Sequence, residues 1–335
     1  MEELRARSPH SEHPRFGKLG DVLAIVCPGQ GSQTPGFLAP WLELPSVADR
    51  LGALGEVVGL DLVAHGTTSD EETIKDTAVA QPLIVAAGIV AAEAMFDAEL
   101  SDLPVVLAGH SVGEITASAL AGVLSAEDAM RFVGVRARGM AKAAAVTPTG
   151  MSAVVGGDRD EVLAAIAAAG AEPANVNGGG QIVAAGTFEA LKQLADNPPA
   201  KARVIPLKVA GAFHTQHMAS AVADLEALRP ELAVSDPAVP LLSNFDGAEV
   251  ASGEAALESL IAQVSRPVRW DLCMETLAAR GVTGVIELAP AGTLVGLAKR
   301  GMPGIKTVAV KGPSDVDAAL ELFAADDASS DKETV

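Results

Sequence analysis

A serine between two glycines is the group in this chain best suited to covalent chemistry. The pentapeptide Gly109-His110-Ser111-Val112-Gly113 follows an apolar run and precedes a helix-like stretch. Small residues around a serine allow the sharp strand-to-helix turn that exposes a nucleophilic hydroxyl. The helix that follows adds free N–H groups and partial positive charge, which suit an oxyanion. The pattern predicts that Ser111 is a nucleophile, although a buried serine in a tight turn has the same local sequence.

A nucleophilic serine needs a base, and histidine is the usual one near neutral pH. Of the six histidines, four are poor candidates because they lie in a polar N-terminal segment, in a predicted loop or directly beside the serine: His10, His13, His65 and His110. His214 is expected at a strand-to-helix junction, where active-site residues gather in open α/β sheets, so we predict that it is the base. His217 is the alternative candidate for the base. If it is not the base, we expect it to lie on the surface or to cap a helix.

The order of these residues departs from that of a conventional α/β-hydrolase. Such enzymes place an acid and then a histidine late in the chain, after the serine. Here no histidine follows residue 217, and no acidic residue lies near His214 in sequence. A main-chain carbonyl can orient the imidazole instead, which would give a dyad.

Two further residues have spacing that fits a site around the serine. If the helix after Ser111 is ~15 Å long and the next one runs back, Arg136 lies ~16 Å along it and returns to the level of the serine. A guanidinium there can bind a carboxylate in bidentate fashion, but the spacing fits a solvated arginine equally well. Gln30 lies in a glycine turn, where its N–H and that of Val112 can form an oxyanion hole. That turn lacks the Lys-Ser/Thr pair of a P-loop, and an ordinary glycine turn is the alternative.

Strand patterns alternate with helix patterns through most of the chain, which favours a parallel sheet with helices on both faces. The predicted strands are 22–26, 105–108, 241–244 and 282–288, and the predicted helices are 78–98, 114–120, 125–145 and 254–263. Residues 149–209 have a different order, β-α-β-β-α-β, which is typical of ferredoxin-like domains. Its strands are 152–155, 174–176, 181–185 and 203–209, and its helices are 158–169 and 187–196. We therefore predict an α/β core formed by 21–148 and 210–320 with a small inserted domain at 149–209.

Composition limits the partners and the compartment. The 335 residues are 49% hydrophobic and carry a net charge of -19, which argues against nucleic acid or an anionic membrane surface as a partner. Cys27 and Cys273 are expected to be buried free thiols in a reducing, cytoplasmic compartment, and no metal site is predicted. The apolar stretch 78–98 contains polar residues and favours a core helix over a membrane span. Residues 1–19 are expected to form a disordered arm or an added extension, and 325–335 an acidic flexible tail.

Several of these motifs together resemble the malonyl-CoA:acyl-carrier-protein transacylases of fatty-acid and polyketide synthesis. The resemblance spans about residues 21–311 and is carried by Pro28-Gly29-Gln30-Gly31-Ser32-Gln33, Gln81-Pro82, Gly109-His110-Ser111-Val112-Gly113-Glu114, Arg136 four residues before Met140, Asn175-Val176-Asn177 and Phe213-His214. As an ordered set these motifs are specific. The resemblance implies an α/β-hydrolase-like core with a ferredoxin-like insertion, in agreement with the pattern above.

The resemblance also implies roles for individual residues. Ser111 would accept a malonyl group from malonyl-CoA and pass it to the phosphopantetheine thiol of an acyl carrier protein, with His214 as base and then acid. Arg136 would bind the malonyl carboxylate, and the carbonyl of Gln263 would orient the histidine. Gln30 and Val112 would be the oxyanion donors. We expect the pocket to be lined by Gln81, His110, Asn175, Asn177, Phe213 and Asn244.

Selectivity and partners follow from the same resemblance. Val112 after the serine and Phe213 before the histidine are similar to malonyl-selective members, whereas Ala289-Pro290-Ala291-Gly292 departs from the usual Gly-Pro-Gly. No cofactor is implied, and we expect a monomer that meets an acidic carrier protein through a local basic face. The candidates for this face, each of which could equally be ordinary solvated surface, are Lys299 with Arg300, Lys306 with Lys311, and Lys192 with Lys201 and Arg203. A serine thioesterase of the α/β-hydrolase type and a non-catalytic thioester-binding module remain the alternatives.

Overall fold

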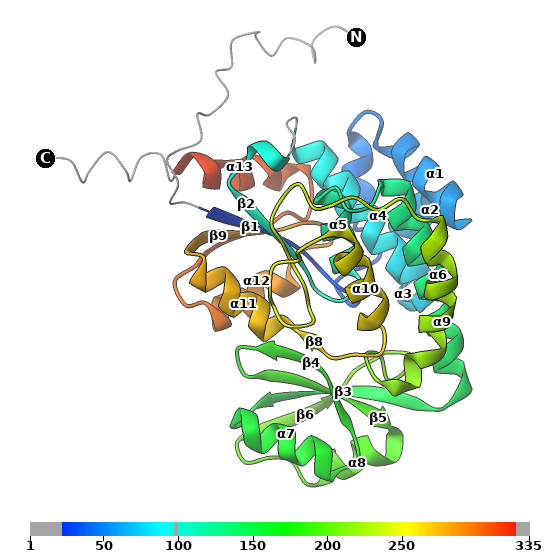
Figure 1. Ribbon diagram of the computed structural model, residues 1–335, viewed down its shortest axis with the longest axis vertical. Coiled ribbons are helices and arrows are strands. Elements are labelled where there is room, and N and C mark those ends of the chain that lie inside the picture. Colours follow the sequence, from blue (N-terminus) through cyan, green and yellow to red (C-terminus); the bar gives the residue numbers. More distant parts are fainter. Residues whose placement is uncertain (1–21, 97–99, 326–335) are drawn as a thin grey trace, which may run out of the picture.

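The computed structural model describes residues 22–96 and 100–325, which form two β-sheets with helices around them (Figure 1). The first sheet is parallel throughout. Its strands lie in the order β10 (Lys306–Ala309), β9 (Val282–Glu287), β1 (Val22–Cys27), β2 (Val105–Gly109) and β7 (Leu241–Leu242). This confirms the predicted parallel central sheet. The expected arm at 1–19 lies outside the described residues, as does the tail apart from its first residue.

Helices cover both faces of this sheet because its central strands are apolar on both sides. In β1, Leu23 and Ile25 face a large apolar cluster, whereas Ala24 and Val26 face a smaller one. Successive side chains of a strand point to opposite faces, so a strand without polar alternation is buried between two layers. The large cluster includes side chains of α1 (Val47–Val58), α2 (Leu62–Thr67), α3 (Glu71–Lys75), α4 (Thr77–Met95), α5 (Gly113–Leu120), α6 (Ala126–Val146), α9 (Ala219–Leu228), α10 (Gly253–Gln263) and α13 (Val316–Ala325). The smaller cluster includes α11 (Trp270–Ala279) and α12 (Thr293–Gly301).

Helix α4 is apolar over most of its circumference and lies at the centre of this packing. By length and composition it could cross a membrane, but 78% of its most apolar window is buried inside the protein. Asp76 caps its N-terminus by accepting a hydrogen bond from the Ala78 N–H at 2.7 Å. The helix predicted at 78–98 is therefore observed as a core helix, but it begins one residue earlier and ends at Met95, with Phe96 already extended.

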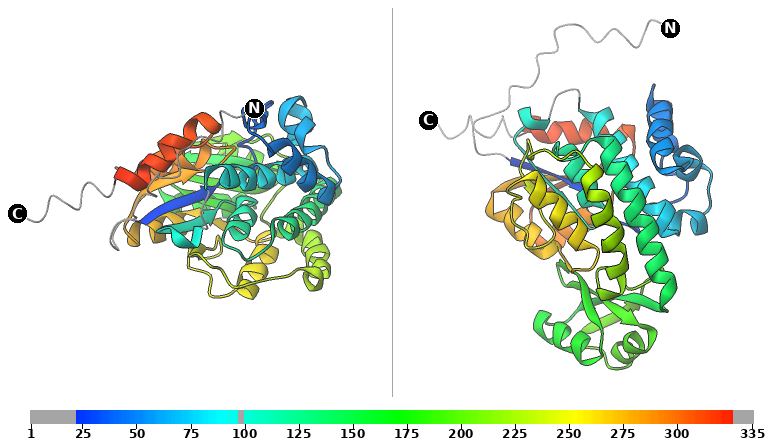
Figure 2. Two further views of the ribbon diagram at one scale, coloured as in Figure 1. Left: turned by 90° about the horizontal axis from the view of Figure 1, so that it is seen from above. Right: turned by 45° about the vertical axis from the view of Figure 1, so that its right-hand side comes forward.

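The second sheet is antiparallel apart from one edge pair. Its strands lie in the order β6 (Ala202–Pro206), β3 (Thr149–Gly156), β5 (Gln181–Thr187), β4 (Glu172–Gly178) and β8 (Val268–Arg269). Helices α7 (Arg159–Ala168) and α8 (Phe188–Asp196) cover its outer face, and its other face is turned toward the parallel sheet (Figure 1). Helices α6 and α9 run side by side from one sheet toward the other (Figure 2).

The strands differ from the prediction at several points, and β8 and β10 were not predicted. The second sheet gains β8 from outside 149–209, where the chain returns to pair in parallel with β4. Strand β6 ends at Pro206 instead of at residue 209, since proline has no N–H with which to continue a ladder. Strand β7 stops at Leu242 instead of at residue 244, because Ser243 begins a turn with Gly247 and the N–H of Asn244 donates to Glu114.

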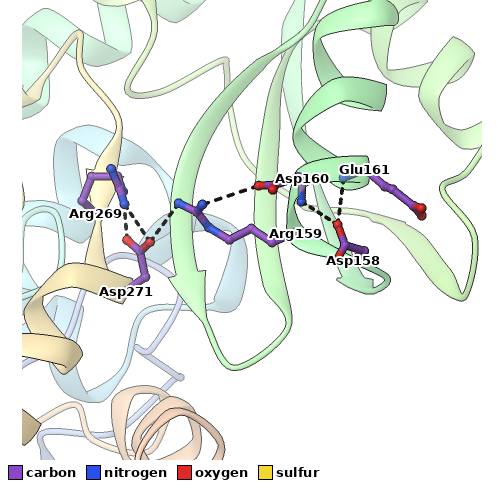
Figure 3. Close-up of polar contacts among 6 residues, drawn as sticks. All are labelled: Asp158, Arg159, Asp160, Glu161, Arg269 and Asp271. Atoms are coloured by element: carbon purple, nitrogen blue, oxygen red, sulfur yellow. Dashed lines mark hydrogen bonds and ion pairs between the residues drawn. The ribbon is translucent and has the colours of Figure 1, made fainter.

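Charged side chains join the second sheet and its helix α7 to α11, the helix that follows β8 (Figure 3). Arg269 donates two hydrogen bonds of 2.9 Å to Asp271, and Arg159 of α7 approaches the same carboxylate at 3.4 Å. Asp158 caps α7 by accepting from the N–H groups of Asp160 and Glu161. Asp271 is buried and pairs with both arginines, so it fixes the α7 end of the second sheet against α11.

Candidate active site

The predicted strand–serine–helix turn is present at the carboxyl end of β2. Ser111 has φ 54°, which is uncommon for a non-glycine residue and typical of strained positions at functional sites. Glycine is required on both sides by close approach of backbone. A Cβ on Gly109 would lie 2.1 Å from the Gly113 carbonyl, and a Cβ on Gly113 would lie 2.1 Å from the Cys27 oxygen.

His214 lies beside the serine, 103 residues further along the chain. Its Nε2 is 2.7 Å from the Ser111 Oγ, and its Nδ1 is 2.8 Å from the backbone oxygen of Gln263. A carbonyl only accepts, so Nδ1 carries the proton and Nε2 presents a lone pair to the hydroxyl. Like the serine, His214 has a positive φ, of 61°. The arrangement can remove a proton from the serine.

The position of Gln263 explains how a carbonyl takes the place of an acid. Helix α10 ends at this residue, where the last carbonyls of a helix have no partner inside it. The partial negative charge of that helix end favours a cationic imidazole once a proton arrives. In the free site, burial and then the charge of Arg136 lower the pKa of His214 to about 3. The imidazole is therefore neutral and able to accept a proton at neutral pH.

Arg136 lies at the same level as the serine, as the antiparallel packing of α5 and α6 predicts. It is 1% exposed, and its Nη2 lies 3.3 Å from the Ser111 Oγ. Nη1 donates to Gln81 at 2.7 Å, and Nη2 donates to the Gln263 side chain at 3.0 Å. Burial lowers its pKa to about 10, which still leaves it charged at neutral pH. A fixed guanidinium beside a serine can bind a substrate carboxylate.

Gln30 and Val112, the two residues predicted as oxyanion donors, lie near the serine. Gln30 lines the cavity that contains the serine, and Val112 directly follows the serine with its side chain fully buried. Within the part of the chain that the structure describes, the N–H groups of both residues pair with no protein acceptor. The N–H of Ser111 is already used, because it donates to the Asn244 Oδ1 at 2.8 Å. The oxyanion role of the two residues stays a prediction.

The site opens into a cavity of about 220 Å³ between the two sheets. Five residues expected in the pocket do line it: Gln81, His110, Asn175, Asn177 and Phe213. The expectation for Asn244 is wrong, because this residue is buried behind the serine, where its side chain also donates to the Gly109 oxygen. The His110 Nε2 lies 2.8 Å from the Asn177 Oδ1, and this contact joins the serine turn to β4 of the second sheet. The sequence did not indicate the apolar walls, which include Met151, Leu207, Leu294 and Leu297.

His65 and His217 do not line the cavity that contains the serine, and His10 and His13 lie outside the described residues. His65 belongs to α2 instead of to a loop, because Asp61 caps a short helix there. His217 lies in a 3₁₀ turn at Gln216–Met218 and does not line the cavity. Both cysteines are free and buried, as predicted. Among the described residues, no group of three or more histidine, cysteine, aspartate or glutamate side chains could hold a metal ion.

Glu114 is the residue of the site that sequence reasoning missed. It is 2% exposed, and burial raises the pKa of its carboxyl to about 7. Its carboxylate accepts from the Asn244 N–H at 3.1 Å and from the Gln263 side-chain amide. The available signal was an acidic residue immediately after the last glycine of the serine turn, in a helix of otherwise small or apolar residues.

Comparison with known proteins identifies relatives of this chain over nearly its whole length. Residues 24–325 match the acyl transferase domain family. The malonyl CoA-acyl carrier protein transacylase of Mycobacterium tuberculosis is 51% identical over 302 residues, which cover 90% of this chain and 100% of the relative. That of Escherichia coli is 33% identical and covers 90% of this chain and 99% of the relative.

Solved structures agree with this assignment. The crystal structure of MCAT from Mycobacterium tuberculosis has a TM-score of 0.86 at 51% identity, with 90% of this chain and 99% of that chain covered. A malonyl-transacylase in complex with a type II PKS acyl-carrier protein has a TM-score of 0.83 at 30% identity, with the same coverage. The chain is thus an acyltransferase, and it belongs to the malonyl CoA-acyl carrier protein transacylase family.

Proposed function

We propose that this protein transfers the malonyl group of malonyl-CoA to the phosphopantetheine thiol of an acyl carrier protein through a malonyl ester of Ser111. The product would supply extender units for fatty-acid or polyketide synthesis. The observation that carries the proposal is the 2.7 Å contact between the Ser111 Oγ and the His214 Nε2, with the Arg136 guanidinium 3.3 Å from the same oxygen. Family membership supports the same substrates.

The first half-reaction forms the acyl-enzyme. The Ser111 Oγ attacks the thioester carbon while its proton passes to the His214 Nε2, and the carbonyl oxygen becomes an oxyanion. The free N–H groups of Gln30 and Val112 are the donors proposed for that oxyanion. When the carbon–sulfur bond breaks, the imidazolium returns the proton to the departing CoA thiolate. The carrier thiol then repeats the steps in reverse, giving its proton to Nε2 and displacing Ser111.

Arg136 is proposed to select the substrate and to protect the ester. A malonyl carboxylate paired with the guanidinium fixes the acyl group beside the serine and fills space that an attacking water would need. Both half-reactions use only the two thioester partners and the side chains named here, so the proposed reaction has no cofactor.

Two parts of the fold form the proposed site. We propose that the parallel sheet and its helices form an α/β-hydrolase-like core, made of 21–148 and 210–320. Residues 149–209 would be a ferredoxin-like insertion, which the antiparallel order β6-β3-β5-β4 supports. The insertion closes the cavity with β4 and β5.

A chase experiment tests the proposed function. The protein is mixed with malonyl-CoA labelled in the acyl group, without acceptor, and then receives a carrier protein bearing phosphopantetheine. A transacylase accumulates label on the protein and discharges it onto the carrier. A thioesterase releases free malonate before the carrier is added, and a thioester-binding module never becomes labelled, so either result would overturn the proposal.

A further inference from the structure

A single buried carboxylate holds two residues that orient the candidate catalytic groups. One oxygen of Glu114 accepts from the backbone N–H of Asn244 at 3.1 Å, and the other accepts from the side-chain amide of Gln263. Glu114 and Asn244 are 2% and 1% exposed, and Gln263 is 5% exposed. With water excluded, each of these groups depends on its protein partners for hydrogen bonds.

Each partner of Glu114 acts on a different part of the site. Gln263 accepts from Arg136 with its side chain at 3.0 Å and from the His214 Nδ1 with its backbone oxygen at 2.8 Å. Asn244 accepts from the Ser111 N–H and donates to the Gly109 oxygen at 2.6 Å, which fixes the strained serine turn. The nucleophile, the base and the guanidinium are therefore joined to one carboxylate through two amides.

Glu114 has no role in the chemical steps of the proposed mechanism, because its side chain contacts neither the serine hydroxyl nor the imidazole. We propose that Glu114 is a positioning residue, whose two carboxylate oxygens hold Gln263 and Asn244 in the orientation that brings Ser111, His214 and Arg136 together. The inference deepens the proposed function and rests on it for the substrate, but the placement of the serine beside its base can be measured with other reagents.

The hydrogen-bond pattern gives a test that separates orientation from mere packing. The Asn244 N–H and the Gln263 amide donate to different oxygens of Glu114, so a glutamine in its place lacks one of these acceptors, and either Asn244 or Gln263 loses its partner. Exchanging the pair repairs this. In the double variant Glu114→Gln with Gln263→Glu, the new amide can accept from Asn244 and donate to residue 263, whose carboxylate can still accept from Arg136. The backbone oxygen of residue 263 stays available to His214.

The experiment measures the rate at which Ser111 is labelled by a fluorophosphonate, a neutral serine reagent, and in parallel by malonyl-CoA. We expect Glu114→Gln to slow labelling by both reagents by about tenfold or more, up to about 10²-fold, as a small misplacement of reacting groups does. The exchanged pair should recover most of the fluorophosphonate rate, and Glu114→Asp part of it. Ile115→Val, which removes a methyl group from the next buried residue of α5, is the matched control for packing and should change the rate less than about twofold.

The outcomes separate the two proposals. If Glu114→Gln labels at the wild-type rate, or if the exchanged pair is as slow as the single variant although both are folded by circular dichroism, the positioning role is refuted. If the wild-type protein reacts with the fluorophosphonate but not with malonyl-CoA, the proposed substrate is wrong. The positioning role then still stands on the fluorophosphonate rates of the variants.

Discussion

Replacing Arg136 with alanine should remove the preference for malonyl over acetyl thioesters while leaving the serine reactive. A malonyl carboxylate paired with the guanidinium has its charges about 4 Å apart, which is worth about 4 kcal/mol at an effective dielectric constant of about 20. At about 1.4 kcal/mol per factor of ten, this corresponds to a preference of about 10³-fold. Acetyl-CoA has no carboxylate and gains nothing from this contact.

The assay is single-turnover acylation of Ser111 by each thioester, followed by intact mass, and the measured quantity is the ratio of the two values of kcat/KM. A partly unfolded variant lowers both rates equally, so the ratio reports the contact and not the stability. Arg138→Ala is the matched control, because that arginine lies two residues further along α6 and is exposed. An unchanged ratio in Arg136→Ala would refute the assignment of the carboxylate site.

Three further predictions follow from the geometry. Acylation should slow as the pH falls through about 7, because the raised pKa of Glu114 makes its carboxyl take up a proton there and lose an acceptor, while the lowered pKa of His214 keeps the imidazole neutral. In Glu114→Gln the acylation rate should be flat from about pH 8 to about pH 5. A remaining inflection near 6.5 would assign the titration to His214. Charge reversal of Lys299 and Arg300, exposed in the last turn of the cavity-lining helix α12, should slow transfer to the carrier protein but not to free pantetheine; equal losses with both acceptors would exclude a docking role. Gly113→Ala places a Cβ 2.1 Å from the Cys27 oxygen and should lower the free energy of unfolding by roughly 1–3 kcal/mol, and an unchanged urea midpoint would show that the turn is not so tight.

Features determined by local sequence could be predicted, and the serine turn is the clearest example. The glycines at 109 and 113, the strand before them and the helix after them lie within a short stretch, and the structure has the turn that they indicate. The layered fold was also accessible, because short apolar runs of strand length alternate with longer helix-like stretches along the chain. Strands β8 and β10 were missed, because β8 has only two residues and no residue of β10 is fully buried, so neither forms a continuous apolar run.

The rest of the site depends on contacts between distant segments. Helix spacing could bring Arg136 to the level of Ser111 but could not decide which way its side chain points, and the buried amides of Gln81 and Gln263 settle that in the structure. The misplacement of Asn244 has the same origin. A polar residue after a short strand fits a cavity wall as well as a buried support, and only the partners of its side chain distinguish the two. Glu114 was missed because both of its partners lie 130 or more residues away.

Peptide mapping after brief exposure to malonyl-CoA tests most directly whether Ser111 and His214 work as a pair. We expect one malonyl group on the peptide that contains Ser111, no label in Ser111→Ala and a greatly slowed appearance of label in His214→Ala. Malonyl on any other residue, or labelling of Ser111 at an undiminished rate without His214, would contradict the mechanism.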